Sequence, residues 1–573
     1  MRHLTYSIVK SFHRIGILLG ISLLTNLGIN FPARSAERVQ VSFDILERTI
    51  SVNSLEAYAK RGIVQTDLAP YIKYIKPQQQ EQLRRILLKR LEVRPIAVTQ
   101  FFNTPQAEIL LRRLGQVIQT ESGEYGAQAI QQALISSAND PEGITLLNVL
   151  RKFPASGVRI DLAKGLQLAD DLSKLIEQSN KAIAAVNQQA TTLVANQSPV
   201  QISTLANLRQ PGSYTVNKQT KQFLDSRRNR SLKADIYVPI PDDNNQRRTA
   251  LPVVVISHGL GSDRKTYAYL AQHLASFGLA VAVLEHPGSN AQQLQNLFEG
   301  KAEEVAQPDE FINRPLDVKF LLNELEVLSR SDIFYWGRLN TQKVGIIGQS
   351  FGAYTSLALA GAEINFPSLQ KDCAGINTSW NLSLLLQCRA LTLPKDNYQL
   401  RDERVKAVIA INPIGSSVFG KNGLNNINIP VTIVAGTADT VAPALPEQIV
   451  PFTWLNNPNK YLLIMNNGTH FSTLVESQSS VPLPVSVIGP NPALAQDYMK
   501  VLSLAFFKFY IAEQPEYQAY LTPSYIKYLS QEPLPLSLVR SLTEAELKLA
   551  LERPSPETVI SPNKRNQTSP NNY

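Results

Sequence analysis

The stretch VGIIGQSFGAYTSLALAG, residues 344–361, passes from an apolar run into small residues through the pentapeptide GQSFG. Two interpretations fit this pattern. In the first, Ser350 is a nucleophile held on a sharp turn between a strand and a helix. In the second, the glycines merely join a buried strand to a helix. At average composition, a chain of this length contains roughly 0.1–0.2 G-x-S-x-G patterns by chance. The pentapeptide therefore does not distinguish the two interpretations, and the rest of the sequence must.

The segments around this stretch predict an α/β protein with a mostly parallel central sheet. Short runs rich in Val, Ile and Leu recur without polar alternation, which is typical of strands buried on both faces. These runs are LPVVVISHG, GLAVAVLEHP, VKAVIAINP, PVTIVAGTAD and KYLLIMNNGTH, and helix-like segments such as TYAYLAQHLASFG and PLDVKFLLNELEVL lie between them. Alternating strands and helices indicate helices on both faces of the sheet, with chemistry beyond the carboxyl ends of the strands.

The remaining chain divides by composition. Residues 37–190 are expected to form a mainly helical domain, and the polar, irregular residues 191–212 a linker. The sheet-forming domain is expected over 213–553, and the tail at 554–573, rich in Pro, Asn and Ser, is expected to be disordered. A basic stripe on EQLRRILLKRLEV could touch lipid headgroups or could simply be a solvated helix face.

The amino terminus, residues 1–35, has the pattern of an export signal. Arg2, Lys10 and Arg14 precede the short apolar core IGILLGISLLTNLG, and ARS at 33–35 offers a small-x-small cleavage site. An uncleaved membrane anchor is the alternative, although the core is shorter than the about 20 residues that a spanning helix needs. We therefore expect an exported protein, in a periplasm, a lumen or the extracellular space.

Charge and cysteine content restrict the class of protein further. The formal net charge of +9 is small for 573 residues, so the sequence does not predict binding to nucleic acid. The only two cysteines, Cys373 and Cys388, favour a disulfide over free thiols in an exported chain, and no histidine lies between them to complete a zinc site. No phosphate-binding loop, dinucleotide motif or metal-ligand spacing occurs, so we expect no cofactor.

A serine nucleophile needs a general base, and the base needs an acid that orients it. Of the six histidines, His470 follows the strand-like run YLLIMNNGTH in a short loop, whereas His273 lies in a helical segment and His286 is a rival base after LEHPGSN. Asp439, in VTIVAGTADTVAP, is the predicted acid, with a turn-capping aspartate as the alternative. The order Ser350, Asp439, His470 is the chain order of α/β-hydrolases.

A tetrahedral intermediate also needs donors for its oxyanion. One should be the backbone N–H of Phe351, directly after the nucleophile. The HGLG loop at 258–261 offers a second through Leu260, since the glycines on either side of Leu260 let a backbone amide come close. A flexible joint between strand and loop is the other interpretation of HGLG.

Taken together, SHGLG, GQSFGAY, AGTADTVAP and NNGTHFS resemble the platelet-activating-factor acetylhydrolase and dienelactone-hydrolase branch of the α/β-hydrolases, over about residues 213–515. The resemblance implies an α/β-hydrolase fold, a triad of Ser350, Asp439 and His470, and oxyanion amides from Leu260 and Phe351. Dienelactone hydrolases use a cysteine nucleophile, and acetylhydrolases usually have histidine where this chain has glutamine before the serine. Residues 37–190 resemble an uncharacterised domain that precedes such hydrolases in photosynthetic bacteria.

Residues 369–404 form an insertion after the GQSFG helix, which is predicted to be a lid or acyl-pocket wall stapled by Cys373 and Cys388. A structural excursion packed against the sheet is the alternative. The predicted function is hydrolysis of carboxylic esters, with a small-molecule or lipid ester as partner and with peripheral membrane contact. A peptidase or amidase on the same fold and a non-catalytic envelope binding or scaffold protein remain as alternatives.

Overall fold

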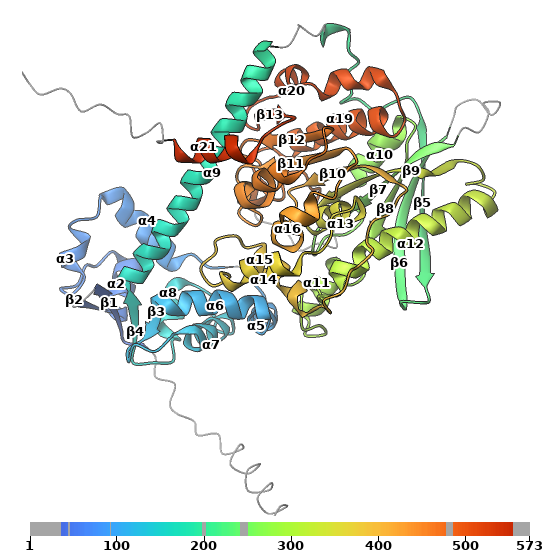
Figure 1. Cartoon of the computed structure of the whole chain (residues 1–573). Coiled ribbons are helices and arrows are strands. Elements are labelled where there is room, and N and C mark those ends of the chain that lie inside the picture. Colours follow the sequence, from blue (N-terminus) through green and yellow to red (C-terminus); the bar gives the residue numbers. More distant parts are fainter. Residues whose placement is uncertain are drawn as a thin grey trace, which may run out of the picture. The chain divides into compact units, whose positions relative to one another are not determined.

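The computed structural model describes residues 36–43, 46–91, 93–196, 202–240, 250–476 and 485–553 (Figure 1). The predicted signal at 1–35 and the predicted tail at 554–573 lie outside the described residues. The chain divides into two compact units, Met1–Val98 with Leu111–Gly165, and Thr99–Leu110 with Leu166–Tyr573. Within the described ranges, no helix is long and apolar enough to cross a membrane.

The first unit contains a four-stranded sheet in the order β2-β1-β4-β3. Its strands are β1 (Arg38–Phe43), β2 (Leu46–Ser51), β3 (Ile118–Thr120) and β4 (Gly157–Asp161), and only the β1–β4 pair is parallel. Its helices are α2 (Val52–Arg61), α3 (Ala69–Ile72), α4 (Pro77–Leu88), α7 (Ala127–Ala138) and α8 (Leu146–Arg151), while α5 (Pro95–Phe102) and α6 (Pro105–Val117) each cross the division between the units. The sequence analysis predicted a mainly helical domain for residues 37–190 and missed the sheet, because its strands are only three to six residues long.

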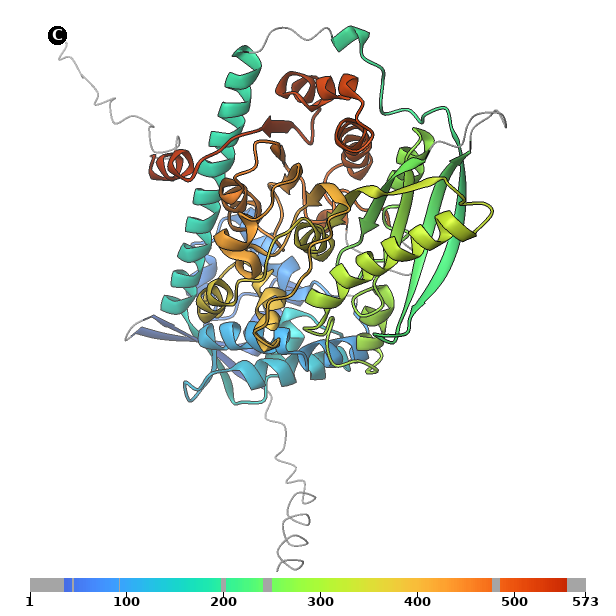
Figure 2. The same cartoon turned by 45° about the vertical axis from the view of Figure 1, so that its right-hand side comes forward.

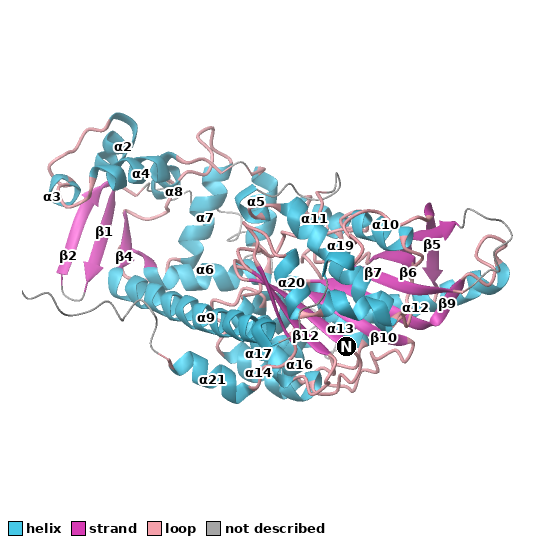
Figure 3. Cartoon of the chain, turned by 90° about the horizontal axis from the view of Figure 1, so that it is seen from above, coloured by secondary structure: helices cyan, strands magenta, loops and turns pink. Residues whose placement is uncertain are grey.

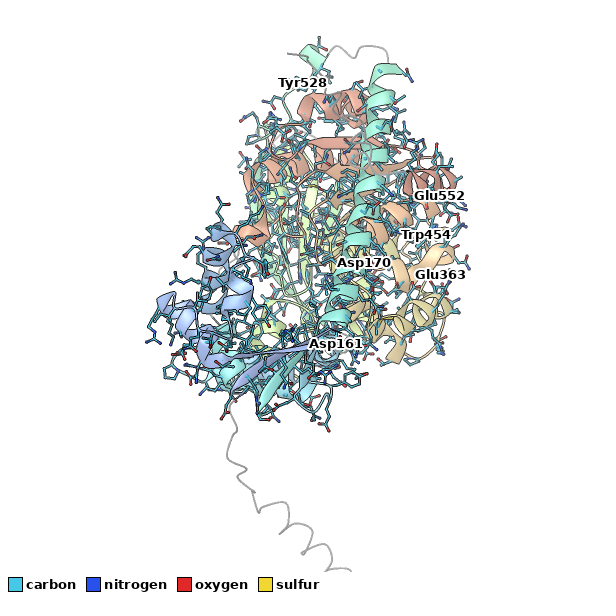
Figure 4. The ribbon with its side chains drawn as sticks, turned by 90° about the vertical axis from the view of Figure 1, so that its left-hand side faces the viewer. Asp161, Asp170, Glu363, Trp454, Tyr528 and Glu552 are labelled. Carbon is cyan, nitrogen blue, oxygen red and sulfur yellow. A yellow bond between two sulfur atoms is a disulfide. The ribbon has the colours of Figure 1, made fainter. Side chains whose placement is uncertain are left out.

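The long helix α9 (Leu162–Asn196) carries the chain from one unit into the other, since the division falls between Gly165 and Leu166. Figure 4 labels Asp170 on the exposed side of this helix. Farther along, four buried residues that share one face of the helix pack into the core of the second unit: Ala182, Ile183, Val186 and Ala190. The helix therefore runs through the start of the linker predicted at 191–212.

The second unit is built on a nine-stranded sheet in the order β13-β12-β11-β10-β9-β7-β8-β6-β5. The strands are β5 (Thr215–Asp225), β6 (Arg230–Ile240), β7 (Leu251–Ser257), β8 (Ala280–Glu285), β9 (Leu339–Gln349), β10 (Val405–Ile411), β11 (Val431–Gly436), β12 (Lys460–Met465) and β13 (Leu536–Val539). The six strands from β12 to β8 pair in parallel, and antiparallel strands close both edges. The predicted mostly parallel sheet is confirmed.

Both faces of this sheet are buried, as the lack of polar alternation predicted. In β7, Val253 and Val255 face one hydrophobic core, while Val254 and Ile256 face the other. The helices of this unit that follow α9 are α10 (Ala268–Ser276), α11 (Ala291–Phe298), α12 (Glu310–Ser331), α13 (Phe351–Leu359), α14 (Phe366–Ala374), α15 (Leu384–Gln387), α16 (Ser416–Leu424), α17 (Val450–Trp454), α18 (Val485–Ile488), α19 (Pro492–Tyr510), α20 (Pro523–Leu529) and α21 (Glu544–Glu552). Figure 3 shows the strands in magenta among these helices, and in Figure 2 α12 lies beside the sheet, which agrees with its contacts to β9 and β5.

The insertion at 369–404 packs against the second unit. Leu369, Leu386 and Ala390 belong to the same buried cluster as the residues of α13 and α16. Cys373 and Cys388 form a disulfide whose half-cystines are 15 residues apart. This packing agrees with the alternative interpretation of the insertion, in which it is a structural excursion rather than a lid.

A buried carboxylate fastens the insertion to its neighbours. Glu447, on the short helix η3 (Leu445–Ile449), is 1% exposed. One of its oxygens accepts hydrogen bonds from Ser383 Oγ at 2.9 Å and Gln387 Nε2 at 2.9 Å, both in the insertion. The other oxygen accepts from the Gly415 and Ser416 amides at 3.1 and 3.2 Å, in the loop after β10. Because η3 follows the loop that carries Asp439, Glu447 ties the insertion to that loop.

Replacing both Cys373 and Cys388 with serine is expected to lower the free energy of unfolding by about 3 kcal/mol, because the bond closes a loop of 15 residues. Guanidinium chloride unfolding, followed with and without dithiothreitol, measures this difference. The wild type should lose stability in reductant, and the double variant should be insensitive to it. Equal stability of the oxidised wild type and the double variant would contradict the expectation.

Candidate active site

Ser350 is the single residue between the end of β9 and the start of α13. Its backbone has φ +55° and ψ −116°, a strained conformation that L-residues rarely adopt. The flanking glycines make this turn possible: a Cβ on Gly348 would lie 1.9 Å from the Gly352 carbonyl oxygen, and a Cβ on Gly352 would lie 2.0 Å from the Ser257 carbonyl oxygen. The Ser350 amide donates to the Ile411 carbonyl at 2.9 Å, which fixes the turn against β10. Both glycines of the pentapeptide are therefore sterically required.

Asp439 and His470 form a hydrogen-bonded pair beyond the ends of β11 and β12. His470 Nδ1–H donates to Asp439 Oδ2 at 2.7 Å. The other carboxylate oxygen, Oδ1, accepts from the amides of Val441 at 2.9 Å and Ala442 at 2.7 Å, so the carboxylate cannot turn away. Because Nδ1 carries the proton in this bond, His470 Nε2 is left as a free acceptor. The sequence predicted this pair from the order of the residues along the chain.

The structure brings the His470 loop to the residue beside Ser350. Gln349 is 2% exposed, and its Nε2 donates to the His470 carbonyl at 3.0 Å. Within the described part of the chain, no hydrogen bond joins Ser350 Oγ to His470; in free active sites such bonds are often long and tighten when substrate binds. Ser350 is 7% exposed, and a Cβ on Gly259 would meet Gln349 Oε1 at 2.2 Å, so the HGLG loop lies on the same side.

Two residues that the sequence analysis missed hold the histidine loop in place. Gln349, where acetylhydrolases usually have histidine, anchors the His470 carbonyl. Asn412, directly after β10 and with φ +43°, donates from Nδ2 to the Thr469 carbonyl at 3.0 Å and accepts from the Gly436 amide at 3.0 Å. Asn412 therefore links the end of β11 to the loop of His470. Its place near the end of the strand-like run VKAVIAINP, directly after the last apolar residue, was the one sequence signal for it.

The predicted oxyanion donors lie at the start of α13 and in the loop after β7. In the described chain, neither the Phe351 amide nor the Leu260 amide donates a hydrogen bond to the protein. Gly261, with φ +69°, turns the loop and donates to the Ser289 carbonyl at 2.9 Å. Both N–H groups therefore have no acceptor among the described residues.

The rival histidines are enclosed in the protein. His286 Nδ1 lies 3.0 Å from Asp317 Oδ2 and its Nε2 lies 3.0 Å from Ser257 Oγ, a second Ser–His–Asp arrangement in which all three residues are 0–1% exposed. Burial, and then the nearby Arg314 guanidinium, hold the pKa of His286 well below its usual range. An ester cannot reach a serine enclosed in this way, so this arrangement is structural. Burial likewise lowers the pKa of His273 to about 4.

An apolar cavity of about 250 Å³ lies beside the HGLG loop and the His470 loop. It is lined by Leu260, Gly261, Ser262, Thr266, Leu294, Phe471, Leu474, Val475, Glu476 and Ile488. Two larger hollows, of about 760 and 650 Å³, are lined by residues such as Glu403, Asn428 and Pro458, which precede β10, β11 and β12. Chemistry in parallel sheets occurs at the carboxyl ends of the strands. The smaller cavity is lined by residues that follow β7 and β12, so it is the candidate cavity for substrate. Among the described residues, no group of three or more His, Cys, Asp or Glu could hold a metal ion.

Two family models match the chain. Residues 35–161 match a family described as an alpha/beta hydrolase of unknown function, and residues 215–332 match the family of platelet-activating factor acetylhydrolase, isoform II. No curated protein matches the chain. These matches confirm the predicted resemblance, and with the parallel sheet they define an α/β-hydrolase fold and support a hydrolase of the ester-cleaving kind. The second match ends before Ser350, so the roles of Ser350, Asp439 and His470 rest on geometry.

Proposed function

We propose that this protein is an exported serine hydrolase of carboxylic esters, with Ser350 as nucleophile, His470 as general base and Asp439 as the acid that orients it. One observation carries the proposal. The His470–Asp439 bond of 2.7 Å leaves His470 Nε2 as an acceptor, on a loop anchored to the residue next to a strained serine. A serine hydroxyl activated by such a pair attacks acyl groups.

The proposed reaction has two halves. In the first, Ser350 Oγ attacks the ester carbonyl carbon while its proton passes to His470 Nε2, and the amides of Leu260 and Phe351 donate to the oxyanion. The carbon–oxygen bond of the ester then breaks, and His470 returns the proton to the leaving alcohol. In the second half, water attacks the acyl-enzyme and loses a proton to His470. The bond from the acyl carbon to Ser350 Oγ then breaks, His470 returns the proton to Ser350 Oγ, and the carboxylic acid leaves.

The apolar cavity beside Leu260 supports an acyl chain as the group bound next to the oxyanion amides. At about 30 Å³ for each water-sized group, 250 Å³ holds a chain of up to roughly eight carbons. Short-acyl or lipid esters are therefore the proposed substrates, with peripheral contact at a membrane surface. Export is supported by the signal-like sequence at 1–35 and by the disulfide, a bond that persists in oxidising compartments.

A panel of p-nitrophenyl esters from acetate to palmitate, run beside the matching p-nitroanilides, tests the proposal. We expect kcat/KM to be highest for esters of up to roughly eight carbons, to fall for longer chains, and to be far lower for every anilide. Faster cleavage of the anilides would favour a peptidase or amidase. No cleavage of any ester would favour a non-catalytic binding or scaffold protein.

A further inference from the structure

Helix α12 buries three charged residues, Glu310, Arg314 and Asp317. The two carboxylates have arginine partners from the β5–β6 hairpin. Arg230 contacts Asp317 at 2.8 Å and Glu310 at 2.7 Å, and Arg228 contacts Asp317 at 2.7 Å. These ion pairs account for both buried acidic side chains of the helix.

Arg314 differs from the other two arginines because its hydrogen bonds go to uncharged oxygens. Its guanidinium donates to Ser289 Oγ at 2.8 Å, Ser257 Oγ at 3.2 Å and Thr355 Oγ1 at 3.2 Å, and also to the His258 carbonyl. Arg314 is fully buried, and burying a cation without a directly bonded carboxylate is costly. Burial lowers its pKa to about 9, against the opposing charges of the two α12 carboxylates, so the guanidinium is charged at pH 7.

The neutral partners of Arg314 belong to both halves of the predicted oxyanion hole. His258 begins the HGLG loop that carries the Leu260 amide. On the other side, the guanidinium carbon lies 4.7 Å from the centre of the Phe351 ring. Thr355 Oγ1, which accepts from Arg314, donates in turn to the Phe351 carbonyl at 2.9 Å. The buried Arg314 guanidinium is therefore linked to both segments that carry the predicted oxyanion donors, the HGLG loop and the start of α13.

We propose that Arg314 is a positioning residue for the oxyanion hole: it holds the Leu260 and Phe351 segments in register and places a positive charge beneath the developing oxyanion. This inference rests on the proposed function. Preorganised donors in a water-excluded site stabilise a transition state strongly, because they need not reorient as charge develops. A charge held in the low-dielectric interior acts in the same direction.

The test compares Arg314→Met and Arg314→Lys with Arg228→Met, a matched loss of a cation in the same cluster. Among the described residues, the Arg228 side chain donates hydrogen bonds to Asp225, Asn313 and Asp317. For each variant we would measure kcat and KM on the best ester, the Ki of a trifluoromethyl ketone of the same acyl chain, and the thermal midpoint.

Arg314→Met should lower kcat by about 100-fold, with KM changed only a few-fold and ketone affinity reduced in parallel with kcat. Arg314→Lys should lie between Arg314→Met and the wild type. Arg228→Met should lower the thermal midpoint and keep kcat.

Thr355→Val keeps the shape of the side chain and removes the hydroxyl that links Arg314 to the Phe351 carbonyl. If Arg314→Met does not fold, this variant tests the positioning role of Arg314 instead. A several-fold loss of kcat and of ketone affinity is expected for it. The inference is overturned if folded Arg314→Met, or Thr355→Val in its place, keeps wild-type kcat and ketone affinity while the wild type hydrolyses esters. A wild type without esterase activity would instead overturn the proposed function.

Discussion

Ser350→Ala is expected to lower kcat for ester hydrolysis by about 10⁴- to 10⁶-fold while leaving the protein folded. The substitution removes one oxygen atom that makes no hydrogen bond to the described residues. Alanine keeps a Cβ, so the backbone strain at φ +55° is unchanged. Steady-state kinetics on a short-chain p-nitrophenyl ester and a thermal melt measure the two quantities.

Ser356→Ala is the matched control for that variant. Ser356 lies on α13, the helix that follows Ser350, is fully buried, and donates to the Ala353 carbonyl at 2.8 Å. Its replacement should cost stability on the scale of one hydrogen bond, about 1 kcal/mol, with kcat retained. If Ser350→Ala kept wild-type activity, the nucleophile would have to be another group.

Asp439→Asn is expected to lower kcat by about 10⁴-fold with little change in fold. The two oxygens of Asp439 have different partners: one accepts from two backbone amides and the other from His470 Nδ1–H. An asparagine keeps the amide contacts only by turning its NH₂ toward His470. Nδ1 must then accept, the proton moves to Nε2, and Nε2 can no longer take the proton of Ser350. Kinetics at saturating ester, with the thermal midpoint as a check on folding, measure the loss.

Asp402→Asn is the control for this carboxylate. Asp402 is also buried, but it lies before β10, at the opposite end of the strands, and pairs with Arg404 at 2.7 Å. Its loss should reduce stability and leave kcat near the wild-type value. Equal losses of kcat in the two variants would point to a general effect on folding and contradict the specific role of Asp439.

The parallel sheet and the positions of Ser350, Asp439 and His470 could be predicted because each depends on local pattern. Apolar runs without alternation indicate buried strands, and the carboxyl ends of parallel strands gather at one edge. The GQSFG pentapeptide itself encodes the turn, since Gly348 and Gly352 are the positions at which a Cβ would collide with backbone.

The residues that support the site could not be predicted in this way, since each acts through contacts far apart in the chain. Gln349 reaches a carbonyl 121 residues away, and Arg314 reaches one 56 residues away. Glu447 gathers donors from an insertion about 60 residues earlier in the chain. No local pattern marks such partners, although the unusual residue before the serine was a signal for Gln349.

The small sheet of the first unit was missed for a different reason. Its strands are short, and RVQVSF, the β1 sequence, alternates over only six residues in a region that also contains the longer amphipathic helices α2 and α4. Its pairing with β4, more than 100 residues later, is what stabilises it. Helical periodicity therefore dominated the prediction for residues 37–190.

Labelling with a fluorophosphonate probe, followed by peptide mass spectrometry of the intact, oxidised protein, tests the central claim most directly. The account predicts one covalent adduct on the peptide that contains Ser350, absent from Ser350→Ala and strongly reduced in Asp439→Asn. Labelling of wild type and Ser350→Ala to the same extent, or an adduct mapped to another serine, would contradict it.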